Sequence, residues 1–166
     1  RGHIERFAEQ NCLYNVAMRG LVEGKPTETI DLVTSVSRCI NPYADYEAFL
    51  ALARSEDLQV IISNTTEAGI AYDANAVYDG TPQLSYPAKL TAFLYERYKA
   101  FGGDVNRGLL ILPCELIDDN GTKLRNIVLQ HVRDWALEEG FAKWLDEANH
   151  FSNTLVDRIV TGFPRD

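Results

Sequence analysis

Two short apolar runs with an amphipathic segment between them constrain the fold of this chain more than any other feature. Residues 58–63 and 108–113 are rich in Ile, Leu and Val and almost continuously apolar, as expected of buried strands. Between them, residues 87–101 place apolar side chains at helical spacing, begin at a proline and end before Gly102 and Gly103. This order of elements predicts an α/β fold, with a mostly parallel sheet covered by helices on both faces.

The N-terminal part of the chain predicts a different local structure. Residues 12–22 and 29–40 are rich in Val, Ile and Thr and lie on either side of a turn sequence at 23–26. This pattern predicts two strands joined as a hairpin. Residues 46–53 then carry apolar side chains at helical spacing, after the break at Pro42, and predict a helix.

Two further helices are expected after the second buried strand. Asp119 or Asn120 should cap a helix whose apolar stripe runs over residues 124–135. A short helix should follow around residues 141–145. His131 lies on the apolar stripe of the longer helix, so we expect a hydrogen-bonded core histidine rather than a catalyst.

Composition excludes several classes of function. A net charge of -8 and a pI of about 4.9 argue against nucleic-acid binding, which needs a basic face. The longest apolar runs are far shorter than a membrane span. Cys12, Cys39 and Cys114 are widely separated, and the three histidines show no metal-ligand spacing. These features predict reduced thiols in a cytoplasmic protein without a metal centre.

Polar side chains follow both buried strands, where open α/β sheets bind their ligands. Residues 63–69 include hydroxyls, an amide and a carboxylate, which suit either a ligand site or a capped turn that opens a short helix. Cys114 and Glu115 follow the second strand, before a turn-like run at 118–121. Because no histidine lies near Cys114 in the sequence, its thiol is expected to be structural or to line a pocket rather than to act as a nucleophile.

A third polar set interrupts the apolar run near the C-terminal end. Asn153, Thr154, Asp157 and Arg158 lie among apolar residues, so they need partners in the fold or on a ligand. Asp157 and Arg158 suit a functional site and a structural ion-pair network about equally well. The chain contains neither Gly-x-Gly-x-x-Gly nor Gly-x-x-x-x-Gly-Lys. Its residues alone therefore predict an α/β domain with polar strand ends, but no particular reaction.

Three of these segments resemble signatures of the mannitol dehydrogenase family, the polyol-specific long-chain dehydrogenases. Residues 64–69 (Asn-Thr-Thr-Glu-Ala-Gly) are similar to the family's Thr-x-Thr-Glu-x-Gly. Residues 114–121 (Cys-Glu-Leu-Ile-Asp-Asp-Asn-Gly) are similar to its Cys-Asp-Asn-Leu-x-x-Asn-Gly. Residues 153–159 (Asn-Thr-Leu-Val-Asp-Arg-Ile) match its Asn-x-x-Val-Asp-Arg-Ile, and the three segments occur in the family's order.

Details of these segments resemble the branch of the family that acts on uronates. Leu116 stands where the wider family has Asn, and Thr161 where it usually has Pro or Ser. Residues 85–91 and 155–166 are also similar to that branch. The resemblance implies reduction of a keto-uronate, tagaturonate, to an aldonate, altronate, with NAD as cofactor. Two alternatives remain: a fructuronate/mannonate or hexitol enzyme of the same family, or a non-catalytic α/β module that binds a nucleotide or a sugar.

The family resemblance also implies a domain organisation. Its members have an N-terminal NAD-binding Rossmann-type domain, followed by a helical domain that supplies a catalytic lysine. Residues 1–166 resemble part of the first domain, without its first βαβ unit. The chain starts at Arg1 without an initiator Met, so we expect it to be part of a longer protein and inactive by itself.

Roles for individual residues follow from the same resemblance. Asn153 matches the family's asparagine that polarises the reacting oxygen, and it would donate a hydrogen bond to that oxygen. Asp157 and Arg158 would hold the loop that carries Asn153. A further set would line the nicotinamide and ribose end of the cofactor cleft: Asn64, Thr65, Glu67, Cys114 and Glu115.

Overall fold

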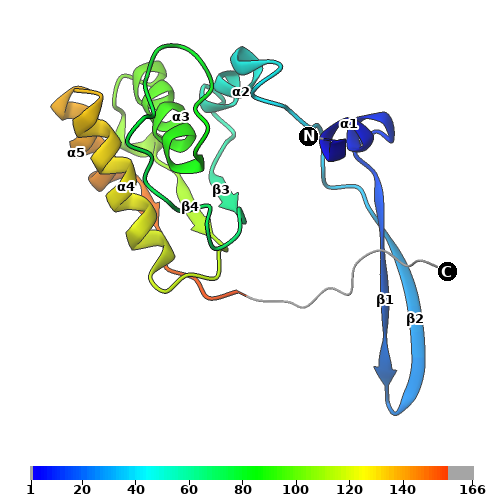
Figure 1. Ribbon diagram of the computed structural model, residues 1–166. Coiled ribbons are helices and arrows are strands. Elements are labelled where there is room, and N and C mark those ends of the chain that lie inside the picture. The colour runs from blue at the N-terminus through cyan, green and yellow to red at the C-terminus, as the bar shows by residue number, and fades with distance from the viewer. Residues whose placement is uncertain (1, 157–166) are drawn as a thin grey trace. The chain divides into compact units, whose positions relative to one another are not determined.

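The computed structural model describes residues 2–156, and the chain divides into two compact units between Phe49 and Leu50 (Figure 1). Asp157 and Arg158 lie outside the described residues. Helix α2 (Tyr46–Ala53), which the sequence predicted, runs across the division.

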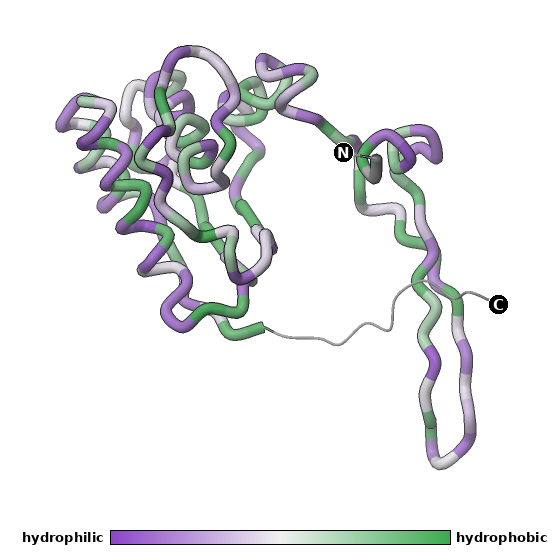
Figure 2. Tube along the Cα trace, in the orientation of Figure 1, coloured by the Kyte–Doolittle hydropathy of each residue, from purple (hydrophilic) through white to green (hydrophobic). Residues whose placement is uncertain are grey.

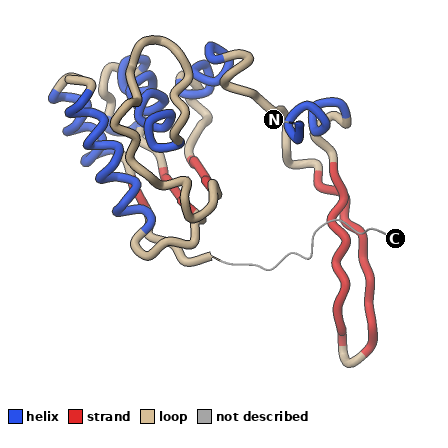
Figure 3. Tube along the Cα trace, viewed as in Figure 1, coloured by secondary structure: helices blue, strands red, loops and turns tan. Residues whose placement is uncertain are grey.

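The first unit contains helix α1 (Gly2–Glu9) and an antiparallel hairpin of β1 (Tyr14–Val22) and β2 (Lys25–Val33) (Figure 3). The predicted hairpin is confirmed. Its second strand, however, begins inside the expected turn and ends at Val33, so the prediction of strand for residues 34–40 was wrong. The cause is a two-residue turn in which Glu23 (φ 51°) and Gly24 (φ 76°) both adopt positive φ, as a type I′ turn requires.

The hairpin turn sets the register of the whole ribbon. Val22 pairs with Lys25, and the pairing continues without interruption to Tyr14 opposite Val33. Apolar and polar residues are mixed along both strands, and Leu21 and Ile30 are exposed (Figure 2). A two-stranded ribbon of this kind is marginally stable by itself in water.

The second unit is built on a parallel sheet in the order β3-β4-β5. Strands β3 (Val60–Ser63) and β4 (Leu110–Pro113) are the two buried runs that the sequence predicted. Between them lies helix α3 (Tyr86–Ala100), whose N-cap Ser85 accepts a hydrogen bond from the Ala88 amide, followed by the 3-10 turn Val105–Arg107. The predicted α/β fold with parallel strands is confirmed.

The elements after β4 complete the second unit. Helix α4 (Asn120–Asp134) and helix α5 (Glu139–Ala148) match the two predicted helices. Strand β5 (His150–Phe151) pairs in parallel with β4, through His150 opposite Leu110 and Phe151 opposite Ile111. Strand β5 was not predicted from the sequence, because two residues are too few to show a periodic pattern.

The helices of the second unit cover one face of its sheet. Ile111 is fully buried beneath them, whereas Val60, Ile62 and Leu110 are exposed on the opposite face, Ile62 to 67%. Right-handed connections that advance in the same direction, from β3 to β4 to β5, place their helices on the same side of a sheet. Within the described part of this unit, the exposed side chains of Val60, Ile62 and Leu110 mark the face of the sheet away from these helices.

The buried guanidinium of Arg97 ties α3 to the segments that lead into β3 and β4. It donates to the carbonyl oxygens of Ala53 and Ser55 at 2.9 Å, of Leu58 at 3.1 Å and of Arg107 at 2.6 Å. Burial, together with the nearby charge of Arg107, lowers the pKa of Arg97. These bonds fix the end of the sheet where the strands begin, opposite the end where the polar loops lie.

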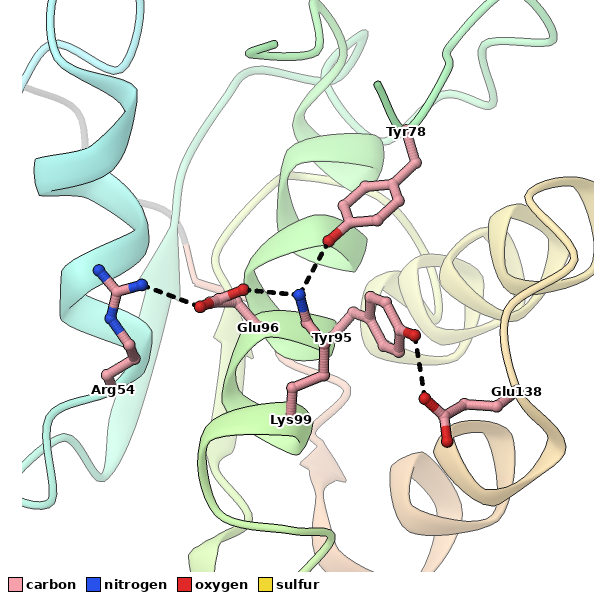
Figure 4. Close-up of polar contacts among 6 residues, drawn as sticks. All are labelled: Arg54, Tyr78, Tyr95, Glu96, Lys99 and Glu138. Atoms are coloured by element: carbon pink, nitrogen blue, oxygen red, sulfur yellow. Dashed lines mark hydrogen bonds and ion pairs between the residues drawn. The ribbon is translucent and has the colours of Figure 1, made fainter. Parts of the chain in front are cut away.

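A second network holds the outer side of α3 (Figure 4). Glu96 pairs with Arg54 and with Lys99, both at 2.9 Å, and Lys99 also donates to the Tyr78 hydroxyl at 3.2 Å. The Tyr95 hydroxyl donates to Glu138 at 3.0 Å. The network joins α3 to the end of α2, to the loop before α3 and to the residue before α5. Arg97 and this network therefore anchor the C-terminal half of α3 from both sides.

His131 is a core residue, as predicted, but it is not fully hydrogen-bonded. Its ring is 1% exposed and lies between Tyr72 and Trp135, each 5.1 Å away between centroids. Its Nε2 is buried and has no hydrogen-bond partner among the described residues. Burial lowers the pKa of His131, and the carboxylates of Asp134 and Asp73 only partly oppose this effect.

We expect His131 to make the stability of the protein depend on pH. A lowered pKa keeps the folded ring neutral, while the unfolded ring takes up a proton near pH 6.5. Its contribution to stability is present above pH 6.5 and is lost as the pH falls through the folded pKa, by at most about 1.4 kcal/mol per pH unit. The His131→Phe variant should lose less melting temperature between pH 7.5 and 5.5 than the wild type does. Exposed His150, replaced by Gln, is the control. An unchanged pH dependence in His131→Phe would contradict this account.

No helix within residues 2–156 combines the length and the apolar character that crossing a bilayer requires.

Candidate functional site

The carboxyl ends of β3, β4 and β5 lie at one edge of the sheet, and the polar segments found in the sequence extend from them. Residues 64–69 follow β3, residues 114–119 follow β4 and lead into α4, and residues 152–156 follow β5. In an open α/β sheet this edge is where ligands bind. The tertiary structure thus brings together the three segments that the sequence analysis singled out.

Glu115 connects the loops after β3 and β4. Its carboxylate is fully buried and accepts hydrogen bonds from the Ser63 hydroxyl at 3.0 Å, the Thr65 amide at 2.9 Å and the Thr65 hydroxyl at 2.7 Å. Glu115 was predicted from the sequence to line a cofactor cleft. The structure instead places this carboxylate beneath the β3 loop, where it positions Thr65, because three donors converge on it and remove it from solvent.

Asn120 connects the loops after β4 and β5. Its side chain is fully buried, and Nδ2 donates to the carbonyl oxygens of Pro113, Glu115 and Thr154 at 2.9–3.0 Å. Its Oδ1 accepts from the Thr154 amide at 2.9 Å and from the Gly121 amide at 2.8 Å. The Thr154 hydroxyl also donates to the Pro113 carbonyl. From the sequence, Asn120 was predicted only as a helix cap. The one signal for its additional role was the position of a polar residue between a turn and an apolar stripe.

Asn153 lies at the first turn of α4. Its Oδ1 accepts from the Thr122 amide at 2.8 Å, so Asn153 caps the helix in place of Asp119, whose side chain makes no capping bond. Its Nδ2 is 3.0 Å from the Thr122 hydroxyl and 3.4 Å from Asp119 Oδ1. The longer contact is a weak hydrogen bond. Asn153 is exposed, so the second hydrogen of Nδ2 can turn to another acceptor.

The backbone is strained in both loops that open toward this edge. Thr66 has φ 75° and Asp119 has φ 54°. Positive φ is unfavourable for a β-branched residue, and such strain clusters at functional sites. In the same loop a Cβ added at Gly69 would lie 1.9 Å from Thr65 Oγ1, so this turn needs glycine. A Cβ at Gly121 would lie 2.3 Å from the Ser152 carbonyl oxygen, so glycine also lets α4 approach the segment after β5.

The other predicted site residues lie on the open side of these loops. Asn64 and Glu67 are exposed and make no side-chain hydrogen bond or ion pair within the described part of the chain. Cys114 is half-buried, with Sγ 3.8 Å from the Leu112 carbonyl oxygen. The alternative that Thr65 or Thr66 caps a short helix is wrong, since residues 64–69 form a turn closed by the Gly69 amide on the Thr66 carbonyl at 2.9 Å.

Tyr86, which the sequence analysis did not consider, places an unsatisfied hydroxyl at this edge. It is the first residue of α3, and its hydroxyl is buried near Ser63 without a hydrogen-bond partner among the described residues. Burial raises the pKa of Tyr86 to about 12, and the Glu115 carboxylate adds to the shift. The phenol therefore stays protonated at neutral pH and can donate or accept a hydrogen bond.

Residues 1–165 match the model of one protein family, the mannitol dehydrogenase Rossmann domain. The chain is 51% identical to an altronate oxidoreductase of Bacillus subtilis (strain 168) over 163 residues, which are 98% of this chain and 34% of that protein. It is also 51% identical to an altronate oxidoreductase of Shigella sonnei (strain Ss046), over 96% of this chain and 33% of that protein. The chain thus spans about a third of the length of the curated relatives it matches.

Two solved structures share the fold. A mannitol 2-dehydrogenase of Pseudomonas fluorescens, in a ternary complex with NAD and D-mannitol, matches 94% of this chain and 32% of its own with a TM-score of 0.74 and 18% identity. A D-sorbitol dehydrogenase in substrate-free form matches 93% of this chain and 33% of its own with a TM-score of 0.72 and 22% identity. At these identities the likeness shows a Rossmann-like fold.

Proposed function

This chain belongs to the mannitol dehydrogenase family, and from that premise we propose that it forms part of a cytoplasmic, NAD-dependent oxidoreductase. The proposed reaction reduces the keto-uronate tagaturonate to the aldonate altronate by hydride transfer. Residues 1–166 contribute part of the NAD-binding Rossmann-type domain, and a further domain of the same polypeptide contributes the catalytic lysine. The observation that carries this proposal is the 51% identity to altronate oxidoreductases over almost the whole chain.

The geometry of the strand ends supports a ligand site in this domain. Glu115 and Asn120 are both fully buried, and between them they bind all three loops at the carboxyl edge of the sheet. A buried polar group that is completely hydrogen-bonded rigidifies its surroundings. The loops are therefore held in place before a ligand arrives, which lowers the entropy cost of binding and of reaching the reactive geometry.

The described residues fit one half of a dinucleotide cofactor. Exposed Asn64 and Glu67 and the Thr65 hydroxyl supply the donors and acceptors that a ribose and a carboxamide need. The buried hydroxyl of Tyr86, without a hydrogen-bond partner among the described residues, is a further polar group near Ser63 at this edge. When bound, the nicotinamide would supply the hydride. A glycine-rich loop for the pyrophosphate does not occur in this chain, so these residues fit the nicotinamide and ribose end alone.

We assign to Asn153 the stabilisation of the reacting oxygen. A carbonyl oxygen gains negative charge as it is reduced, and a positioned N–H donor stabilises that charge more than it stabilises the neutral carbonyl. Thr122 holds the amide of Asn153 by three contacts, through its own amide and hydroxyl. The other Nδ2 hydrogen makes only the 3.4 Å contact with Asp119. It is therefore the hydrogen that can turn to the substrate.

A substrate panel on the full-length protein tests the proposal. Tagaturonate, fructuronate and fructose should each be assayed with NADH and with NADPH, by the loss of reduced cofactor. We expect tagaturonate with NADH to give the highest kcat/KM, by about tenfold or more, because sites that hydrogen-bond a substrate reject analogues that leave those bonds unmade. A preference for fructuronate or fructose would change the proposed substrate but keep the proposed reaction, an NAD-dependent reduction of a ketone. No turnover of any of the three would contradict the reductase proposal.

A further inference from the structure

Two thiols meet at the base of the hairpin in the first unit. Cys12 Sγ lies 3.6 Å from Cys39 Sγ. Cys12 precedes β1 and Cys39 follows β2, so the contact bridges the two ends of the segment that contains the whole hairpin. Two sulfur atoms at van der Waals distance need to approach by about 1.6 Å to reach disulfide bond length.

We propose that Cys12 and Cys39 form a redox-active pair, which a peroxide converts to a disulfide that closes the base of the hairpin. In the first step one thiol attacks the peroxide and the O–O bond breaks. When the oxidant is hydrogen peroxide, the products are a sulfenic acid and water. In the second step the other thiol attacks the sulfenic sulfur, the S–S bond forms, and a second water leaves. Two thiols are oxidised and one peroxide is reduced.

The surroundings of the two thiols decide which reacts first. Cys12 is 4% exposed, whereas Cys39 is half-buried and can be reached by a small oxidant. Cys39 is therefore the thiol that attacks the peroxide, and Cys12 is the one that resolves the sulfenic acid. Burial and the hydrogen bond to Cys12 raise the pKa of Cys39. Since the thiolate is the nucleophile, oxidation should be faster at pH 9 than at pH 7.

The disulfide would act on the hairpin rather than on the parallel sheet. The bond closes a loop that includes β1, the turn and β2. An isolated two-stranded ribbon opens easily, and closing its base removes open conformations from its ensemble. Amide hydrogens of β1 and β2 should therefore exchange with solvent several-fold more slowly in the oxidised protein.

Peptide mapping of the full-length protein tests the pair. After treatment with hydrogen peroxide and blocking of remaining thiols, trypsin should release residues 7–19 linked to residues 39–54, with the loss of two hydrogen atoms. Dithiothreitol should separate them. Cys114→Ser should keep this link, and Cys12→Ser and Cys39→Ser should each abolish it. Hydrogen exchange of the hairpin is then compared between oxidised and reduced protein.

The outcomes separate clearly. The proposal is supported if the linked peptide forms in the wild type and in Cys114→Ser but in neither of the other two variants, and if the amide hydrogens of the hairpin exchange more slowly after oxidation. Sulfinic acid at Cys39 without the link, or links from Cys12 or Cys39 to other cysteines, would overturn the pairing. If Cys12→Ser does not fold, Cys39→Ser decides the point, because Cys39 is only half-buried. A link that leaves hairpin exchange unchanged would overturn the claim that the disulfide constrains the hairpin.

Discussion

Replacing Asn153 with Ala in the full-length protein should lower kcat by roughly 10²-fold or more, the effect expected for one lost donor to a developing oxyanion. Binding of NADH should stay nearly unchanged, because the role we propose directs Asn153 to the substrate oxygen. Asn153 also caps α4 through the Thr122 amide, so the variant should lose about 1 kcal/mol of stability as well. Asn153→Asp should lower kcat at least as much, since a carboxylate repels negative charge.

A matched capping variant separates catalysis from stability. Ser85 caps α3 through the Ala88 amide at 3.3 Å, so Ser85→Ala should cost a similar stability and leave kcat intact. Thr122→Val keeps the backbone cap but removes the hydroxyl that orients Asn153, so it should lower kcat by less than Asn153→Ala does. Measurements of kcat, NADH Kd and melting temperature on one preparation decide the matter. Near-normal kcat in Asn153→Ala, with the melting temperature lowered as in Ser85→Ala, would restrict Asn153 to a structural role.

The Asn120→Asp variant should lose about 3–5 kcal/mol of stability, although the two side chains have nearly the same shape. The change removes both N–H donors and turns a carboxylate toward the carbonyl oxygens of Pro113, Glu115 and Thr154. The Thr154 carbonyl loses this donor, and the carbonyls of Pro113 and Glu115 each lose one of two donors. In this fully buried position the amides of Gly121 and Thr154 still donate to the new carboxylate, but no cation compensates its charge. Urea denaturation of the full-length protein measures the loss.

The same helix offers a control for Asn120. Asn126 lies on α4 and is exposed, so Asn126→Asp makes the same chemical change where water can solvate the charge. It should alter stability by no more than about 0.5 kcal/mol. Equal stability of Asn120→Asp and Asn126→Asp would mean that Asn120 does not hold the loops after β4 and β5 together.

The sequence by itself determined the elements whose signal is local. Apolar runs of the right length specified β3 and β4, and helical spacing specified α3, α4 and α5. The polar residues after each strand marked the edge of the sheet where their loops meet. The motif resemblance correctly predicted the family, because it depends on the order of residues and not on their contacts. Strand β5 was not predicted, because a two-residue strand shows no periodic pattern. The start and end of β2 were predicted several residues too late, because the positive φ of Glu23 in the turn is not evident from its residue type.

Tertiary structure alone decided which polar residues hold the loops at the strand ends and which are exposed. Glu115 and Asn120 looked like members of a polar loop and a helix cap, yet both are fully buried and bind residues up to 52 and 34 positions away in the sequence, respectively. Asn153 caps a helix that begins 33 positions earlier, and Cys12 meets Cys39 across the base of a hairpin. A hydrogen bond or a thiol contact depends on distance and direction between groups that are far apart along the chain, and only the packing of strands and helices sets these.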